Sequence, residues 1–376
     1  MRAVTAKERL GRELSRGNLL LEKSGGGEGQ PVGAVVLYDD DQPAVCSNFV
    51  ARMELAQGMV PSFWRYVHAA AYAVRLTTRS INQTSGIQNL DQSQYFDELV
   101  PFPPEGEQTA IATFLDQETG KINALVEEQK RLIRLLKEKR QAVISHAVTK
   151  GLDPSVRMKS SGLEWLGEVP EHWEVRRLAT LFRAVAEAGS ADLPIFSVSI
   201  HHGVSDTELD EDELERKVAR SDDRSKYKRV ERGDLVYNMM RAWQGAFGAV
   251  QTVGMVSPAY VVARPTEAFA TRFVEAMLRT PTAIEEMRRR SRGVTDFRLR
   301  LYWEEFKDLT VALPPPDEQR AIMDFVAAED TRIGDLVDES RRLVDLLQER
   351  RTALISAAVT GKIDVRNITL AHGRAA

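Results

Sequence analysis

An internal repeat constrains the fold of this chain more than any other feature of its sequence. Residues 103–153 align with residues 314–364 without a gap, at a constant offset of 211 positions, and roughly half of the paired residues are identical. An offset of this length is too long for a solenoid unit. The repeat therefore predicts two large modules, each consisting of a variable part followed by the same helix.

Both copies of the repeat carry apolar residues at heptad spacing, which predicts a long helix in each. Because two matched seams occur in one chain, we expect the helices to bury them against each other as an antiparallel coiled coil and to act as a rigid spacer. Their nearly identical ends are expected to present equivalent surfaces to a partner. The predicted seam consists of Ile122, Leu125, Gln129, Leu132, Leu136, Lys139 and Val143, and of Ile333, Leu336, Ser340, Leu343, Leu347, Arg350 and Leu354.

Composition narrows the setting of the protein. The chain has 376 residues and a formal net charge of -4, which is compatible with two or three domains and with local basic patches. It contains no run of eighteen apolar residues and no N-terminal apolar stretch of the signal-peptide kind, so we expect a cytoplasmic protein without a membrane partner. A single cysteine, Cys46, excludes an internal disulfide, and six scattered histidines indicate no metal site.

The two variable parts read as mixed α/β domains, so the predicted fold class is α+β. In the second part we expect strands at 192–200, 233–239, 246–250 and 257–263 and a helix at 271–290. The first part shows the same order in shorter form, since 16–20 parallels 232–236 and 47–52 parallels 257–262. The predicted segments are a first domain at 1–105, helices at 106–153 and 317–365, a second domain at 154–316 and a tail at 366–376.

Basic residues cluster in the second domain. Six arginines lie at 288–300, with Gly293 breaking the helix in their midst, and Arg224, Lys226, Lys228 and Arg229 surround Tyr227. Either cluster fits a solvated charged face. Arginines at a helix end beside a glycine loop also suit phosphate contacts and the reading of guanine.

A glycine-rich segment in the first domain, residues 22–33, follows an expected strand. Its glycines would expose backbone N–H groups beside Lys23 and Ser24, where a phosphate or a base edge could approach. It lacks the Gly-Lys-Ser/Thr ending of a nucleotide-binding P-loop.

Three segments together resemble the specificity subunit of type I restriction-modification systems. Residues 162–178, with Trp165-Leu166-Gly167 and His172-Trp173, look like the opening of a target-recognition domain of that family. Residues 313–322 look like the start of its spacer helix, and residues 22–33 resemble a recurrent loop of its recognition domains. The resemblance covers essentially the whole chain, and the paired organisation makes it specific.

The resemblance implies a non-catalytic subunit that recognises a bipartite sequence in double-stranded DNA through two target-recognition domains. It further implies docking of two methyltransferase subunits on the paired helices, with restriction and translocation subunits joining that core. S-adenosylmethionine, ATP and magnesium would belong to those partners. In agreement, the sequence contains no methyl-donor loop, no adenine pocket of the Asn-Pro-Pro-Tyr type and no Walker lysine. The residue types of a nuclease site are present in Asp116, Glu128 and Lys130, but these residues lie along the predicted coiled coil.

The first domain departs from the family pattern at its beginning. About 65 residues separate Trp165 from Arg232, whereas fifteen residues precede the matching Arg16. About fifty residues, including the Trp-Leu-Gly and His-Trp opening, are therefore expected to be missing from the first domain, through a misassigned start codon or through truncation or decay of the gene.

We expect DNA contacts from four segments, residues 23–30, 82–89, 238–243 and 288–300. Arg241 is suited to guanine, Asn238 and Gln244 to adenine, and Lys23 to phosphate. Alternatives left open are a coiled-coil adaptor that binds proteins, a decayed subunit with one working recognition domain, and an enzyme with its own nuclease site. The candidate DNA-binding residues are Lys23, Ser24, Gly25, Gly26, Gln30, Asn82, Gln88, Asn238, Arg241, Gln244, Arg288, Arg290, Arg292 and Arg298.

Overall fold

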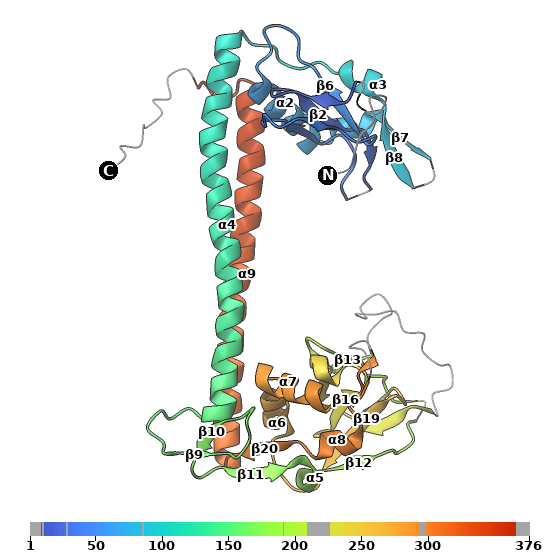
Figure 1. Ribbon diagram of the computed structural model, residues 1–376, viewed down its shortest axis with the longest axis vertical. Coiled ribbons are helices and arrows are strands. Elements are labelled where there is room, and N and C mark those ends of the chain that lie inside the picture. The colour runs from blue at the N-terminus through green and yellow to red at the C-terminus, as the bar shows by residue number, and fades with distance from the viewer. Residues whose placement is uncertain are drawn as a thin grey trace. The chain divides into compact units, whose positions relative to one another are not determined.

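The computed structural model describes residue 9 and residues 11–27, 29–84, 86–190, 192–208, 226–293 and 298–365. The chain forms two compact units, residues 1–133 with 338–376 and residues 134–337. Each unit combines a mixed domain with one end of each of two long helices, α4 (Glu105–Lys150) and α9 (Pro316–Val359) (Figure 1). The predicted α+β fold class is confirmed. The predicted tail, 366–376, lies outside the described residues.

The mixed domain of the first unit, residues 9–104, is called the first module. Its central antiparallel sheet has the strand order β4-β2-β6, and β3 joins the β7–β8 hairpin. Its helical elements are α2 (Pro61–Ala73), η1 (Leu76–Ser80) and α3 (Gln92–Phe96). Its strands are β1 (Glu13–Leu14), β2 (Leu19–Glu22), β3 (Ser24–Gly25), β4 (Val35–Leu37), β5 (Ala44–Val45), β6 (Val50–Met53), β7 (Ile81–Thr84) and β8 (Ile87–Leu90).

The mixed domain of the second unit, residues 151–315, is called the second module. Its main sheet is antiparallel, with the strand order β12-β19-β16-β17. Its helical elements are α5 (Leu178–Leu181), η3 (Ala242–Gln244), α6 (Thr271–Leu278), α7 (Pro281–Arg290) and α8 (Trp303–Lys307). Its strands are β9 (Met158–Ser160), β10 (Glu168–Pro170), β11 (Glu174–Arg177), β12 (Phe182–Val185), β13 (Val198–Ser199), β14 (Gly203–Val204), β15 (Lys228–Val230), β16 (Leu235–Asn238), β17 (Phe247–Ala249), β18 (Gly254–Val256), β19 (Tyr260–Pro265) and β20 (Thr310–Leu313).

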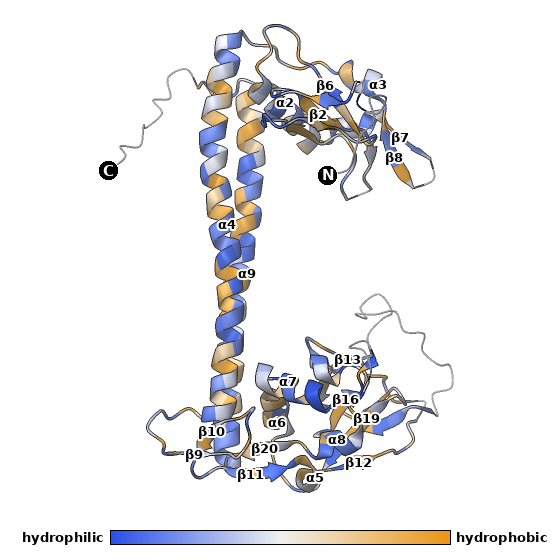
Figure 2. Ribbon diagram, viewed as in Figure 1, coloured by the Kyte–Doolittle hydropathy of each residue, from blue (hydrophilic) through white to orange (hydrophobic). Residues whose placement is uncertain are grey.

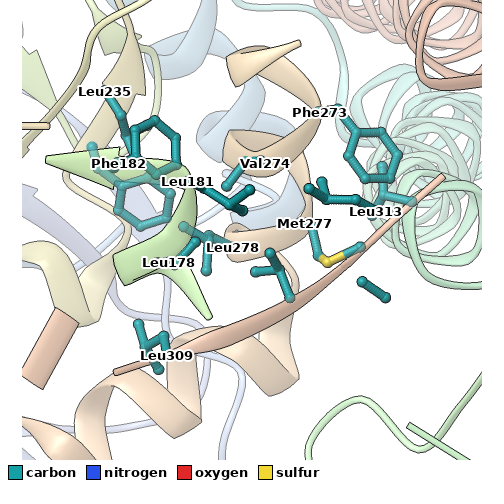
Figure 3. Packing of buried hydrophobic residues seen from close by; sticks show 14 of the residues in the cluster. Leu178, Leu181, Phe182, Leu235, Phe273, Val274, Met277, Leu278, Leu309 and Leu313 are labelled. Atoms are coloured by element: carbon teal, nitrogen blue, oxygen red, sulfur yellow. The ribbon is translucent and has the colours of Figure 1, made fainter. Parts of the chain in front are cut away.

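Each module has its own core, and each core includes residues of the long helices. In the first unit, Phe63 of α2 and Leu19 of β2 pack with Leu115 of α4 and Ala358 of α9. In the second unit, α6 is the centre of the core, and Figure 3 shows its buried side chains among those of α5, β12, β16 and β20. The long helices are thus part of each domain core and are not free-standing attachments.

Two predicted elements of the second module need correction. The helix expected at 271–290 is two helices, because Pro281 cannot continue the ladder of α6 and instead begins α7, whose N-cap Thr280 accepts the Ala283 N–H at 3.4 Å. The strand expected at 192–200 is reduced to β13. The other three predicted strands are confirmed as β16, β17 and β19.

The two long helices pair antiparallel, as predicted, and this can be followed inside each unit. In the first unit, Ile122 and Val126 of α4 pack with Val344 and Leu347 of α9. In the second unit, the side chain of Arg140 of α4 forms an ion pair with Asp330 of α9. Figure 2 shows apolar residues interleaved with polar ones along both helices.

The register of the predicted seam is wrong at every second position. Leu125 is 51% exposed, whereas Val126 is 7% exposed, and in the second copy Leu336 is exposed where Val337 is buried. Leu132 and Leu343 are likewise exposed. Both the leucines and their β-branched neighbours are apolar, so the sequence pattern allowed either choice, and the structure selects the β-branched residues.

A buried glutamine in each copy of the repeat joins helix to module in the same way. Gln319 Nε2 donates to the Pro314 carbonyl at 2.8 Å, and its Oε1 accepts the N–H of Ala270, the N-cap of α6, at 2.9 Å. Gln108 Nε2 donates to the Pro103 carbonyl at 2.9 Å, and its Oε1 accepts the N–H of Val60, the N-cap of α2, at 2.9 Å. The repeated Pro-Pro-x-x-x-Gln motif therefore encodes a module anchor.

The predicted parallel between the modules is confirmed for their central strands. β2 and β16 each lie between two antiparallel strands, with β6 and β19 as the matching neighbours. β1 pairs with β5 as β15 pairs with β18. Within the described residues the first module has no counterpart of β9 to β12, of which β10 and β11 lie in the family-like opening at residues 162–178 of the second module.

Candidate nucleic-acid interface

A tight loop after β16, residues 238–245, holds three of the predicted DNA-binding residues. Asn238 is buried, and its Oδ1 accepts the Met240 N–H at 3.0 Å, while its carbonyl accepts the Arg241 N–H at 2.9 Å. Gly245 ends η3 with a φ of 98°, a conformation that favours glycine. Asn238 therefore shapes the loop from within, and its amide is less suited to adenine than the sequence suggested.

The outer face of this loop carries Arg241 and Gln244. Arg241 is partly exposed and its Nε donates to Gln244 Oε1 at 3.3 Å, so the two side chains are already oriented together. Trp243 Nε1 donates to the Met240 carbonyl at 3.1 Å, and the Arg288 guanidinium lies 5.9 Å from the centre of the Trp243 ring. Helix α7 thus supports the loop from one side, and the guanidinium of Arg241 is held at its surface.

The arginine cluster is partly neutralised by nearby carboxylates. Arg290 pairs with Glu286 at 2.6 Å, and Arg292 forms an ion pair with Glu305, a largely buried residue of α8. Arg288 lies 3.8 Å from Glu285. Glu305 is distant in sequence from the arginine it binds, so sequence reasoning missed this compensation. A phosphate that approaches these arginines has to compete with carboxylates already in place.

The loop that follows α7 is closed by a short antiparallel bridge between Arg292 and Arg300. Arg298 is exposed on this loop. Residues 294–297 lie outside the described residues. The bridge brings Arg292 and Arg298 onto one loop beside the C-terminus of α7, where positive side chains also complement the helix dipole.

A second basic cluster, around Tyr227, is largely engaged within the module. Lys228 Nζ donates to the Tyr260 carbonyl at 2.6 Å, and its burial lowers the pKa of this amine. Arg229 pairs with Glu231 at 3.4 Å, and the ring of Tyr227 is buried. Arg224 lies outside the described residues. This cluster is a weaker candidate for DNA contact than the loop at 238–245.

The glycine-rich segment of the first module is a folded turn. Gly26 has a φ of 61°, and a Cβ there would lie 2.8 Å from the Val32 nitrogen, so only glycine fits. Gln88, from the neighbouring β8, is buried and its Oε1 accepts the Val32 N–H at 3.2 Å. We therefore assign Gln88 to support of the turn. Ser24 and Gly25 form β3, Lys23 precedes it partly buried, Gln30 is exposed, and Glu28 lies outside the described residues.

The β7–β8 hairpin places Asn82 opposite Asn89, with both side chains exposed. This hairpin corresponds to the loop at residues 291–300 of the second module, called the arginine loop. Each precedes a short helix with a buried aromatic residue at matching repeat positions, Tyr95 in α3 and Phe306 in α8. Sequence reasoning chose both segments but missed their equivalence. One place in the module therefore carries candidate readers in both halves of the chain.

The structure does not bring the candidate nuclease residues Asp116, Glu128 and Lys130 together in one site. Asp116 accepts hydrogen bonds from Arg65 at 2.5 Å and Tyr66 at 2.8 Å. Glu128 lies twelve residues further along the same helix, about 18 Å away along its axis. No group of three or more metal-ligating side chains occurs in the described ranges. No helix in the described part of the chain is both long and apolar enough to cross a membrane.

Comparisons with known proteins found similar proteins both by sequence and by fold. No family model matches the chain. The specificity subunit of the Escherichia coli type I restriction enzyme EcoBI is 24% identical over 306 residues, covering 75% of this chain and 61% of that protein, so the match spans less than two thirds of the relative.

Two solved structures share the fold over 93% of this chain. The HsdS subunit from Thermoanaerobacter tengcongensis matches with a TM-score of 0.50 and 13% identity, over 82% of its own chain. A chain from a structure described as showing complex assembly and conformational transition of the type I restriction-modification system matches with a TM-score of 0.60 and 15% identity, over 83% of its own chain.

Proposed function

We propose that this chain, whose sequence and fold resemble those of type I specificity subunits, is the non-catalytic DNA-recognition subunit of such a complex. The observation that carries the proposal is the duplicated anchor. Two modules with different loops are each fixed to the paired helices through the same buried glutamine. A scaffold that keeps its anchors and varies its loops suits two recognition domains that read two different half-sites of one bipartite target.

Direct readout is assigned to the loop at residues 238–245 of the second module and to the β7–β8 hairpin of the first module. In the second module, Arg241 is suited to guanine and the arginines of α7 and the following loop to phosphates. In the first module, the exposed amides of Asn82 and Asn89 are suited to hydrogen bonding with base edges. Lys23 and the glycine turn are suited to the DNA backbone.

The paired helices are the proposed docking surface for two methyltransferase subunits. Exposed leucines recur on both helices at matched repeat positions: Leu125 with Leu336, Leu132 with Leu343, and Leu135 with Leu346. Leucines that the coiled coil does not use, duplicated at the repeat offset, fit two copies of one partner with an apolar face. S-adenosylmethionine, ATP and magnesium are assigned to the partner subunits, as is the attachment of the restriction subunits.

Native mass spectrometry of the chain mixed with its methyltransferase subunit tests the docking. The intact chain is expected to bind two copies. Leu132→Arg and Leu343→Arg are each expected to leave one copy bound, and the double variant none. Leu152→Arg, which changes an exposed leucine outside the helices, serves as the control. Two bound copies on the double variant would contradict this surface.

Gel-shift titration of the assembled complex on randomised DNA tests recognition itself. Enrichment of a motif at moderate salt is expected. The adaptor alternative predicts no enrichment. The alternative with one working recognition domain has less support, because the first module retains a buried core with Leu19, Phe63 and Val67.

A further inference from the structure

The β7–β8 hairpin of the first module is a two-stranded ribbon. Its strands pair in a regular antiparallel register from Ile81 opposite Leu90 to Thr84 opposite Ile87. β3 adds a short third strand to β8, where Ser24 lies opposite Asn89. Figure 1 shows the hairpin projecting from the rest of the first module. A two-stranded ribbon of this kind fits the width of the DNA major groove.

Burial alternates along β8 and separates the two faces of the hairpin. Ile87 is 53% exposed and Asn89 is also exposed, whereas Gln88 and Leu90 are each only 6% exposed. Asn82, directly opposite Asn89, is exposed as well. Because residues opposite each other across two strands share a face of the sheet, the outer face carries two amides and one branched apolar side chain.

The second module shows that this place remains exposed in a module that contains strands β9 to β12. Those strands are present there, and Arg298 and Arg300 of the matching arginine loop are exposed all the same. The exposure of the hairpin face is therefore a property of its place in the module, and it does not depend on which strands precede it in the chain.

The side chains of the outer face match adenine and thymine better than guanine and cytosine. An asparagine amide offers one donor and one acceptor, which match N7 and the N6 amino group of adenine, and an apolar side chain matches the methyl group of thymine. Guanine is best matched by a cationic donor and cytosine by a carboxylate acceptor. Residues 81–90 contain no charged side chain. The hairpin therefore has the chemistry to read A·T pairs.

The spacing along β8 separates the apolar contact from the amide contacts. Ile87 and Asn89 are two residues apart on one strand, which places them about 7 Å apart along it, about two base-pair steps. Arg79 lies two residues before β7, and its side chain is 72% exposed and 3.9 Å from Glu98. A positive charge at the root of the hairpin suits the phosphate backbone, while the outer face reaches two different base pairs.

We propose that the β7–β8 hairpin lies in the major groove of one half-site and reads two A·T pairs. Asn82 and Asn89, which lie opposite each other, bind the adenine of one pair. Ile87 contacts the thymine methyl group of the other pair. This inference rests on the proposed recognition of DNA and adds to it the base atoms that the first module reads.

Anisotropy titration of the complex with the methyltransferase subunit, on the duplex preferred in selection, tests this with single-atom changes in the bases. 7-Deazaadenine removes N7 and uracil removes the methyl group, and each is placed at every adenine or thymine in turn. One position of each kind is expected to lose about fourfold in affinity through the hairpin. Asn82→Ala combined with Asn89→Ala is expected to remove only the 7-deazaadenine response, and Ile87→Ala only the uracil response. Val36→Ala, at an exposed apolar residue of β4, is the matched control and is expected to keep both.

Base responses that the hairpin variants leave unchanged at every position would overturn this inference while the proposed function stands. A G·C pair at the position where a hairpin variant relaxes the preference would overturn it as well. Loss of the methyltransferase subunit from these variants, with unchanged base responses, would identify the hairpin as a protein contact and equally contradict it. An intact complex that prefers no sequence would instead overturn the proposed function, and this inference with it.

Discussion

The β7–β8 hairpin and the arginine loop occupy the same place in the two modules but differ in charge. Residues 81–90 contain no charged side chain, whereas the matching residues 292–301 contain three arginines and one aspartate. The elements around them are matched, since Tyr95 and Phe306 are both buried and Gln108 and Gln319 make the same anchor. The anchor is thus fixed by buried hydrogen bonds, and the exposed loop is free to change its recognition chemistry.

The largest expected effect is the loss of stability on replacing the two anchor glutamines. Gln108 makes two more hydrogen bonds than Gln319, since its Oε1 also accepts from Trp64 Nε1 at 3.2 Å and its Nε2 donates to the Gly58 carbonyl at 3.0 Å. Gln108→Ala is expected to destabilise its unit by about 4 kcal/mol and Gln319→Ala by about 2 kcal/mol. Hydrogen exchange resolved by unit measures both. Gln30→Ala, at an exposed glutamine, is the control, and equal losses at the two anchors would contradict the assigned bonds.

A loss of stability on acidification is expected in the first module. His68 is partly buried, and the resulting desolvation lowers its pKa to about 4; its Nδ1 lies 2.8 Å from the Tyr95 hydroxyl. The unfolded state, with a histidine pKa near 6.5, binds the proton first, so the stabilisation is complete above about pH 6.5 and is lost as the pH falls towards 4. The loss is at most about 3 kcal/mol.

Thermal unfolding from pH 7 to pH 4.5, followed by exchange in each unit, measures this difference. His68→Leu introduces the residue that stands at the same distance from the N-cap in α6, Leu278, and is expected to remove the pH dependence from the first unit. A first unit whose stability falls equally in this variant would show that His68 is not the cause.

The sequence encodes the long-range architecture of this chain better than its local contacts. The repeat predicted both long helices and their pairing, because identical heptad patterns can bury each other. It did not decide between Leu125 and Val126, since both are apolar. Nor did it reveal the Arg292–Glu305 pair, which the tertiary fold brings together. Asn238 and Gln88 look like base readers in sequence, but the fold turns their amide oxygens to backbone N–H groups.

At the loop of residues 238–245 we expect an effect on specificity. Arg241→Ala is expected to cost about 2 kcal/mol on the preferred sequence and to relax the preference at one base pair. Selection on randomised DNA with the assembled complex measures this. Arg320→Ala, at an exposed arginine of α9, is the control. A uniform loss on all sequences would instead make Arg241 a phosphate contact.

The smallest expected effect is on the salt dependence of DNA binding. Arg298→Ala is expected to reduce the slope of log affinity against log salt by about one, because one phosphate contact is lost. Asn82→Ala is expected to lower affinity while leaving the slope unchanged, because an amide releases no counterion. Equal salt slopes for the two variants would contradict the proposed difference in charge between the arginine loop and the β7–β8 hairpin.

The central claim is that two separately anchored modules read two half-sites. Selection of randomised DNA by the complex of this chain with its methyltransferase subunit, repeated after replacing residues 238–245 with a different loop, tests it most directly. The account predicts two half-sites at a fixed gap, of which the replacement changes one and leaves both the other half-site and the gap unchanged. A single continuous motif, or two half-sites that change together, would contradict it.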